Sequence, residues 1–270
     1  MTAETDLTSA GGDIVTWRDG PVQWLMFNRP HARNAMTFAM YDQLLAICER
    51  VNLDRDVRAL VLTGAGSRAF VAGTDISQFR AFATEQDALD YEDRGNRVMA
   101  TLERVRVTTI AAIAGSCTGG GAAIAASCDL RIASPSGQFG FPIARTLGNC
   151  LSMPNYARLV ALLGTARAKD LLMTARLMSA PEMLAVGLVS EVVPDEGSLR
   201  ERAQELAEQV AGLAPLTLWA TKEALRRLRE HLAPPLGADR DLIATCYMSG
   251  DFKEGVESFL SKRPPAWRGE

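Results

Sequence analysis

The sequence has little histidine, with only His31 and His231 among its 270 residues. Two imidazoles are too few for a histidine-rich metal centre, and they leave a Ser-His-Asp triad only two candidate bases. The five cysteines are an odd number, and no two of them form a C-x-x-C pair. This pattern argues against a disulfide framework and a zinc knuckle, and it favours a reducing compartment. We therefore predict no metal site.

The sequence also lacks an excess of basic charge and a long apolar run. Its 29 Lys and Arg residues face 32 Asp and Glu residues, which leaves a net charge of −3. No apolar stretch approaches the roughly 18 residues of a membrane span. Residues 1–12 have neither the basic start nor the apolar stretch of a targeting signal. We predict a cytoplasmic protein that binds neither nucleic acid nor membrane.

The composition, 47% hydrophobic and 23% charged, is that of a globular chain long enough to bury a core. Two extended runs, 13–17 and 22–27, flank a turn signal and predict a hairpin. Apolar strands recur at 59–62, 109–113 and 130–133 with helical periodicity between them. This alternation indicates an α/β fold with crossover units and a mainly parallel sheet.

The organisation changes near residue 197, after which the periodicity is only helical. We expect a flexible tail at 1–12, a β/α core at 13–196 and a helical region at 197–270. A helical tail longer than the core requires suggests a role in oligomerisation.

Two glycine-rich turns follow buried strands. The first, 64–69, has the spacing G-x-G-x-x-A of a dinucleotide fingerprint, but residues 70–75 are extended where that fingerprint needs a helix. The second, 119–121, leads into a helix of small residues. Free N–H groups at a helix start suit a phosphate or a developing oxyanion, although the P-loop lysine is missing here. Close packing of helix on strand is the alternative reason for these glycines.

Five segments form a spaced set of motifs: N-R-P-H-A-R-N-A-M at 28–36, F-V-A-G-T-D-I at 70–76, the stretch 113–133 around the triple glycine, 180–193, and 259–264. In this order they resemble the motifs of the enoyl-CoA hydratase/isomerase (crotonase) family. The likeness extends over roughly residues 13 to 265.

This resemblance implies a spiral of ββα units with a helical C-terminal trimerisation region, assembled as a homotrimer or a dimer of trimers. It implies an acyl-CoA substrate and no separate cofactor, because coenzyme A enters as part of the substrate. In the family, two backbone N–H groups hold the thioester oxygen as it becomes an enolate. By motif position these groups belong to Thr74 and Gly120.

The resemblance also implies contacts to the substrate. His31 and Arg33 are similar to the family's basic stretch near the coenzyme A phosphates, and a solvated loop is the alternative. Phe259 and Lys262 match positions that reach the nucleotide bound by a neighbouring subunit, and the alternative is a core contact beside a solvated lysine. The remaining motif residues assigned to substrate binding are Ala72, Asp75, Ile76 and Pro142. For Asp75, a role as a cap or turn residue is the alternative.

The sequence departs from the family at the two glutamates that the hydratases use. Their positions hold Ala123 and Ile143, and a one-residue shift of register gives Ala144 instead. Adding water to a double bond needs a base for the water and an acid for the α-carbon. The resemblance thus predicts thioester binding and enolate stabilisation under a nominal hydratase/isomerase label. A divergent decarboxylase or hydrolase, or an acyl-CoA-binding protein without turnover, remains an alternative.

Other residues are candidates for the missing chemistry. Arg145 is a charge in an apolar stretch, so we hypothesise that it meets an acidic acyl group, with a surface arginine as the alternative. Cys150 is a candidate nucleophile or a small hydrophobic residue. The segment 77–106 carries carboxylates that we interpret as a solvated face: Glu85, Asp87, Asp90, Glu92 and Asp93.

Overall fold

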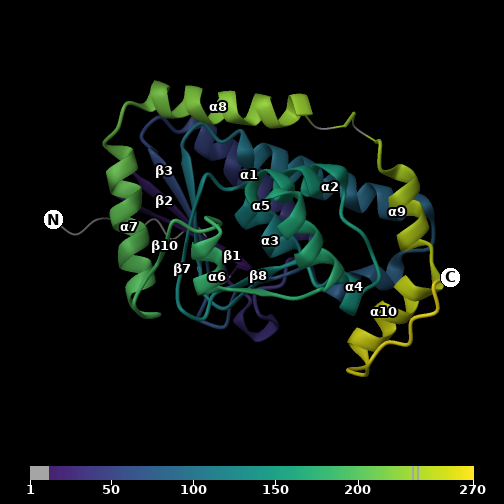
Figure 1. Cartoon of the computed structure of the whole chain (residues 1–270). Coiled ribbons are helices and arrows are strands. Elements are labelled where there is room, and N and C mark those ends of the chain that lie inside the picture. The colour runs from purple at the N-terminus through teal and green to yellow at the C-terminus, as the bar shows by residue number, and fades with distance from the viewer. Residues whose placement is uncertain (1–11, 233, 236) are drawn as a thin grey trace.

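The computed structural model describes residues 12–232, 234–235 and 237–270, and it is built around two β-sheets (Figure 1). The predicted tail at 1–12 lies outside the described residues, apart from Gly12. The larger sheet has the order β1-β2-β3-β5-β7-β10 and the smaller one the order β4-β6-β8-β9.

The strands of the larger sheet are β1 (Ile14–Asp19), β2 (Val22–Phe27), β3 (Ala59–Gly64), β5 (Thr108–Ile113), β7 (Leu130–Ala133) and β10 (Glu191–Val192). The hairpin of β1 and β2 is antiparallel, and the other pairs in this sheet are parallel. The smaller sheet consists of β4 (Ala69–Ala72), β6 (Ser116–Thr118), β8 (Gln138–Gly140) and β9 (Met178–Ser179). This second sheet was not predicted as such, because strands of two to four residues carry too little alternation to be recognised. The α/β fold with crossover units is confirmed.

The helices lie between and around the sheets. They are η1 (Pro30–Ala32), α1 (Phe38–Leu53), η2 (Ile76–Ala81), α2 (Glu85–Glu103), α3 (Gly120–Ser127), α4 (Ile143–Thr146), α5 (Met153–Met173), α6 (Ala180–Ala185), α7 (Ser198–Ala211), α8 (Pro215–Leu232), α9 (Arg240–Tyr247) and α10 (Gly250–Leu260).

Local sequence explains the start of α1. Thr37 precedes the helix with extended backbone, and its hydroxyl accepts a hydrogen bond from the Met40 N–H at 3.2 Å. Such a cap satisfies one of the free N–H groups of the first turn. Met40, Leu44 and Ile47 then recur at helical spacing and are buried in the main core. Helix α1 is therefore explained by its local sequence.

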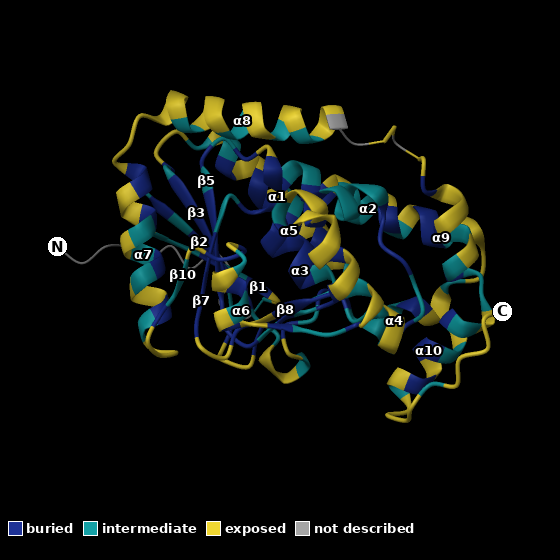
Figure 2. Cartoon of the chain, viewed as in Figure 1, coloured by how far each residue is buried: buried dark blue, intermediate teal, exposed yellow. Residues whose placement is uncertain are grey.

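The C-terminal helices cover two different faces. Helix α7 packs on the larger sheet, where Ala203 and Ala207 join Trp24, Val61 and Ile110 in a cluster of buried side chains. Helix α8 runs along the outside of the molecule and is largely exposed (Figure 2).

Helices α9 and α10 turn back onto η2 and α2. There Tyr247 and Phe252 pack with Phe79 and Leu89 in a third buried cluster. The expected helical C-terminal region is present, and its last two helices close over the end of α2. In the part of the chain that the structure describes, no helix is long and apolar enough to span a membrane.

Candidate active site

A cavity of about 150 Å³ lies where the two glycine-containing motif segments meet. The segments Ala72 to Thr74 and Thr118 to Gly120 form one wall. Tyr41 from α1 and Tyr91 from α2 line it as well, while α10 contributes Phe259. The motif residues Ile76, Pro142, Ala123 and Ile143 also face this cavity. The fold thus brings together motif residues that are up to 187 positions apart, from Ala72 to Phe259.

The two glycine segments touch through their backbones. Gly73 and Gly119 have φ values of 94° and 53°, a conformation that favours glycine. A Cβ atom built on Gly119 would lie 3.5 Å from the Cα atom of Gly73. The two segments therefore lie close together, and other residues would be strained at both positions.

The orientation of two peptide groups follows from their carbonyl oxygens. The Gly73 carbonyl accepts a hydrogen bond from the Met36 N–H at 2.9 Å, and the Gly119 carbonyl accepts one from the Ala123 N–H at 3.0 Å. In a trans peptide the N–H points opposite to the C=O. The N–H of Thr74 therefore points away from Met36, and the N–H of Gly120 points out of the first turn of α3.

A chain of hydroxyl groups lies against Gly120. The Thr74 hydroxyl is 2.9 Å from the Tyr41 hydroxyl and 2.9 Å from the Tyr91 hydroxyl. Burial raises the pKa of Tyr41 to about 12, so this phenol stays protonated at neutral pH. These three hydroxyl groups carry three protons, and two of the protons are used in the hydrogen bonds between them. The third proton is available to another acceptor.

A second polar group centres on Glu92, which is only 8% exposed and lines the cavity. Its Oε1 atom accepts a hydrogen bond from the Tyr247 hydroxyl at 2.5 Å. The same hydroxyl accepts one from Asn149 Nδ2 at 3.0 Å. Burial raises the pKa of the Glu92 carboxyl to about 7, although Tyr247 and Ser152 oppose the shift by hydrogen bonding. The interpretation of Glu92 as part of a solvated face is therefore wrong.

The two positions at which the resemblance predicts an absent glutamate lie at the cavity. Ala123 and Ile143 both line it, and each presents an apolar side chain. Neither can move a proton, so any acid or base must come from another element.

Arg145 does not reach the cavity. In α4, Ile143 and Thr146 face the cavity, whereas Arg145 is exposed. Residues three apart share one side of a helical turn, and the two residues between them face elsewhere. The hypothesis that Arg145 meets an acidic acyl group is corrected accordingly.

We expect Arg145→Ala to leave the ratio of the affinities for malonyl-CoA and butyryl-CoA unchanged within about twofold, because an exposed charge is screened by solvent. Calorimetric titration of both thioesters into the two proteins measures this ratio. A selective loss of malonyl-CoA affinity would restore the original hypothesis.

Four other predicted contacts, Asp75 among them, lie outside the cavity lining. His31 and Arg33 are exposed at η1, but the Arg33 carbonyl accepts a hydrogen bond from the Ala72 N–H at 3.1 Å, which attaches this loop to the cavity wall. Lys262 is exposed just beyond α10.

The side chain of Asp75 has a structural task. It accepts a hydrogen bond from the Ser77 N–H at 3.2 Å as the cap of η2, and it pairs with Arg29 at 3.0 Å. The alternative reading of Asp75 as a capping residue is the one that the structure bears out. These bonds lower the pKa of Asp75, although partial burial opposes them.

Phe259 lines the cavity of its own chain, because α10 folds back onto η2. Its side chain is also half-exposed. The expected contact of Phe259 with a nucleotide bound by a neighbouring subunit stays a prediction.

Cys150 lines the cavity without the features of a nucleophile. Burial raises the pKa of its thiol, and neighbouring Cys246 and Glu92 raise it further. Only the thiolate is a good nucleophile. The reading of Cys150 as a small hydrophobic residue agrees with this environment.

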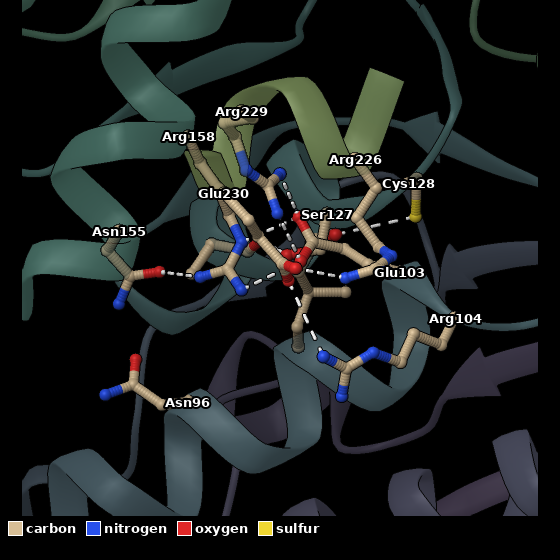
Figure 3. Close-up of polar contacts among 12 residues, drawn as sticks. Asn96, Glu103, Arg104, Ser127, Cys128, Asn155, Arg158, Arg226, Arg229 and Glu230 are labelled. Atoms are coloured by element: carbon tan, nitrogen blue, oxygen red, sulfur yellow. Dashed lines mark hydrogen bonds and ion pairs between the residues drawn. The ribbon is translucent and has the colours of Figure 1, made fainter. Parts of the chain in front are cut away.

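Helix α2 is anchored at its far end by a buried ion cluster (Figure 3). Arg158 donates to both carboxylate oxygens of Glu103, at 2.8 and 3.0 Å, and Arg229 pairs with the same carboxylate. Arg104 reaches Glu230 at 3.5 Å. This cluster lines a separate cavity of about 690 Å³ on the other side of α2.

Sequence reasoning missed Tyr41, Tyr91 and Tyr247, and it misplaced Glu92. A signal existed for Glu92, because it shares a helical stripe with buried Leu89 and Met99. A charged residue on an apolar stripe is a candidate for a buried functional group. Nothing in the sequence indicates that Tyr247 would be its partner.

Comparison with known proteins gives one consistent result. Residues 19–270 match the family described as Enoyl-CoA hydratase/isomerase. The short-chain-enoyl-CoA hydratase of Clostridium acetobutylicum is 33% identical, over 93% of this chain and 95% of that protein. The 2,3-dehydroadipyl-CoA hydratase of Escherichia coli is 32% identical, over 95% of this chain and 99% of that protein.

Solved structures agree. An enoyl-CoA hydratase/carnithine racemase from Magnetospirillum magneticum has a TM-score of 0.78 and 30% identity, with 97% of each chain covered. A methylmalonyl-CoA decarboxylase in complex with 2-nitronate-propionyl-CoA has a TM-score of 0.87 and 27% identity, with 97% of this chain and 100% of that chain covered.

Proposed function

This chain belongs to the enoyl-CoA hydratase/isomerase family, and from that premise we propose that it binds an acyl-CoA thioester and stabilises its enolate. The backbone N–H groups of Thr74 and Gly120 form the oxyanion hole. Acceptance of the developing charge by these two groups lowers the barrier to any reaction that passes through the enolate.

Two peptide groups that border one cavity carry this proposal. Thr74 and Gly120 belong to segments that lie against each other through their backbones. In each segment the preceding glycine carbonyl accepts a hydrogen bond, and the N–H group of the same peptide points in the opposite direction. Backbone donors fixed in this way need no reorganisation when charge develops. Each such donor contributes about 3 kcal/mol to the stabilisation of an oxyanion.

The rest of the substrate is assigned by chemistry. The acyl group lies among Ile76, Pro142 and Phe259, which border the cavity. The coenzyme A phosphates meet His31 and Arg33 on the exposed loop beside Ala72. Guanidinium groups suit phosphate because they offer two parallel donors.

A second candidate reaction is decarboxylation of an acyl-CoA that carries a carboxylate. Apolar Ala123 and Ile143 favour it, as does the likeness to a methylmalonyl-CoA decarboxylase. In that reaction the bond from Cα to the carboxylate breaks and carbon dioxide leaves. The electron pair moves to the thioester as an enolate, which then takes a proton at Cα. No base is needed for the bond-breaking step, only the oxyanion hole and a proton donor.

The proposal is tested by incubating the protein with a panel of acyl-CoA thioesters in deuterated water. Mass spectrometry reports deuterium at Cα, added water and lost carbon dioxide in one measurement. We expect deuterium at Cα of at least one thioester. A protein that binds none of the panel contradicts the proposal, and tight binding with no product over a long incubation favours an acyl-CoA-binding protein.

Assembly and location are further parts of the proposal. We expect a homotrimer or a dimer of trimers in the cytoplasm. Exposed apolar side chains on α8, among them Leu216, Trp219 and Leu228, support association. Sedimentation velocity distinguishes one, three and six chains.

A further inference from the structure

The two positions that carry acid–base groups in the hydratases hold Ala123 and Ile143 here, yet a carboxylate reaches the same cavity from another helix. We propose that Glu92 on α2 is the catalytic residue that exchanges a proton with the α-carbon of the acyl group. This role rests on the proposed function of the cavity. Tyr247 acts as a positioning residue for its carboxylate.

Helix α2 separates two cavities and presents Glu92 to only one of them. Glu92, Gly95 and Met99 line the cavity that contains Thr74 and Gly120. Spacings of three and four residues place these side chains on one face of the helix. Asp93, Asn96 and Ala100, on the adjacent face of the helix, line the larger cavity beside the ion cluster. Glu92 therefore lines the same cavity as the proposed oxyanion hole, although it comes from outside the family motifs.

The partners of Glu92 differ from those of Glu103, the other buried glutamate of α2. Glu103 is held by two arginines, which lower the pKa of its carboxyl against the effect of burial. Glu92 accepts a hydrogen bond from a phenol instead. Within the described residues, no Lys, Arg or His atom lies within 4.0 Å of its carboxylate. A carboxylate without a cation is free to take up a proton, whereas Glu103 is not.

The charged groups around Glu92 favour its protonated form. Asp93 on α2 and Asp239 before α9 are acidic and raise the pKa of the carboxyl, whereas the hydrogen bond from Tyr247 lowers it. The other titratable groups near it are neutral: the phenols Tyr41, Tyr91, Tyr156 and Tyr247 and the thiols Cys150 and Cys246. Burial has the largest effect and brings the pKa of Glu92 to about 7. A group with a pKa near the working pH is effective both as a base and as an acid.

The proton exchange moves one proton between Cα and Glu92. The Cα–H bond of the bound thioester breaks, and its proton forms an O–H bond with the Glu92 carboxylate. The electron pair of the broken bond moves into the thioester, and the negative charge appears on its oxygen beside the Thr74 and Gly120 N–H groups. In the reverse step Glu92 returns a proton, or a deuteron taken up from solvent, to Cα. No oxidant or other reactant is required.

The test compares Glu92→Gln with Asp90→Asn, a substitution of the same kind on an exposed carboxylate of the same helix. Deuterium incorporation at Cα of bound butyryl-CoA is followed by mass spectrometry, and thioester affinity by calorimetry. We expect Glu92→Gln to slow incorporation by about a hundredfold or more, the range for loss of a general base, and to bind the thioester normally. Asp90→Asn should match the wild type in both measurements.

A pH profile separates a catalytic role from a structural one. As a base, Glu92 must be ionised, so incorporation should fall as the pH drops through about 7. Tyr247→Phe removes a hydrogen bond that lowers the pKa of the carboxyl, so the profile should shift to higher pH while its plateau is retained. Loss of a purely structural contact would lower the rate at every pH alike.

Folding of the variant is checked by thermal unfolding. Because the pKa of Glu92 is raised in the folded state, its contribution to stability is present at low pH and is lost as the pH rises through about 7. Above this pH the folded protein must bury an ionised carboxylate, which lowers its stability. Glu92→Gln removes this cost and should raise the melting temperature at pH 8.

Equal incorporation by Glu92→Gln and the wild type overturns the assignment. A wild type that binds the thioester but exchanges no proton at any pH also overturns it. A wild type that binds no thioester contradicts the proposed function instead, so the two failures are distinguishable.

Discussion

Gly120→Val is expected to lower turnover of any acyl-CoA substrate by at least about a hundredfold, the loss seen when one oxyanion donor is removed. A Cβ atom on Gly120 would lie 2.2 Å from the Tyr41 hydroxyl and 3.3 Å from the Thr74 hydroxyl. The first of these distances is too short for any real contact, so either the helix start or the tyrosine must move. The added methyl groups would also occupy the space in front of the two N–H groups.

The assay is the rate of deuterium incorporation or product formation, with circular dichroism to show that the variant is folded. The single variant Gly120→Ala should show most of the same loss of turnover. Combining it with Tyr41→Phe removes the oxygen at 2.2 Å, while the nearest ring carbon would be 3.5 Å away, an ordinary contact. Partial recovery in the double variant would locate the defect at this contact. A folded Gly120→Val protein with wild-type turnover would refute the placement of the oxyanion hole.

Glu103→Ala is expected to destabilise the protein by about 3–5 kcal/mol, the cost of leaving a buried charge without its partner. Glu103 and Arg158 have side chains that are 8% and 4% exposed, and Arg229 shares the same carboxylate. Removal of the carboxylate leaves the Arg158 guanidinium buried beside a second cation, as the cluster in Figure 3 makes clear. Urea unfolding at pH 7 measures the change in the free energy of unfolding.

The matched control is Glu257→Ala, which breaks the exposed pair of Arg80 and Glu257 at 3.2 Å. Their side chains are 57% and 53% exposed, so this loss should stay below about 1 kcal/mol. Equal losses in both variants would show that burial does not set the strength of the Glu103 cluster.

The same cluster predicts a dependence of stability on acid. The arginines hold the pKa of Glu103 below its ordinary value of 4.5. Its contribution to stability is therefore present above that value and is lost as the pH falls through the folded-state pKa. The free energy of unfolding of the wild-type protein should decrease as the pH falls through this acidic range. In Glu103→Ala, the part of this decrease that is due to Glu103 should be absent.

Much of the fold and part of the site were predictable because they depend on local sequence. The helix at 37–52 has its own cap and apolar stripe. Gly73 and Gly119 mark backbone conformations that favour glycine, and those conformations place the neighbouring N–H groups. The motif positions of Thr74 and Gly120 therefore led to the same cavity wall.

Side chains outside the motifs were not predictable in this way. Arg145 and Ile143 are two positions apart in the sequence, and only the short helix α4 decides that one is exposed while the other lines the cavity. Likewise, Phe259 borders its own cavity because α10 returns to η2.

The sequence by itself determined the family and the α/β fold, because both depend on short motifs and on local periodicity. The sequence also shows that histidine is scarce, which leaves backbone donors and carboxylates as the candidate catalytic groups. Only the tertiary structure decided which of the acidic residues enters the cavity. Glu92 is buried because α9 folds back over α2 and sets Tyr247 against it, a contact between residues 155 positions apart. Burial and its effect on a carboxyl depend on such distant packing, which no local pattern specifies.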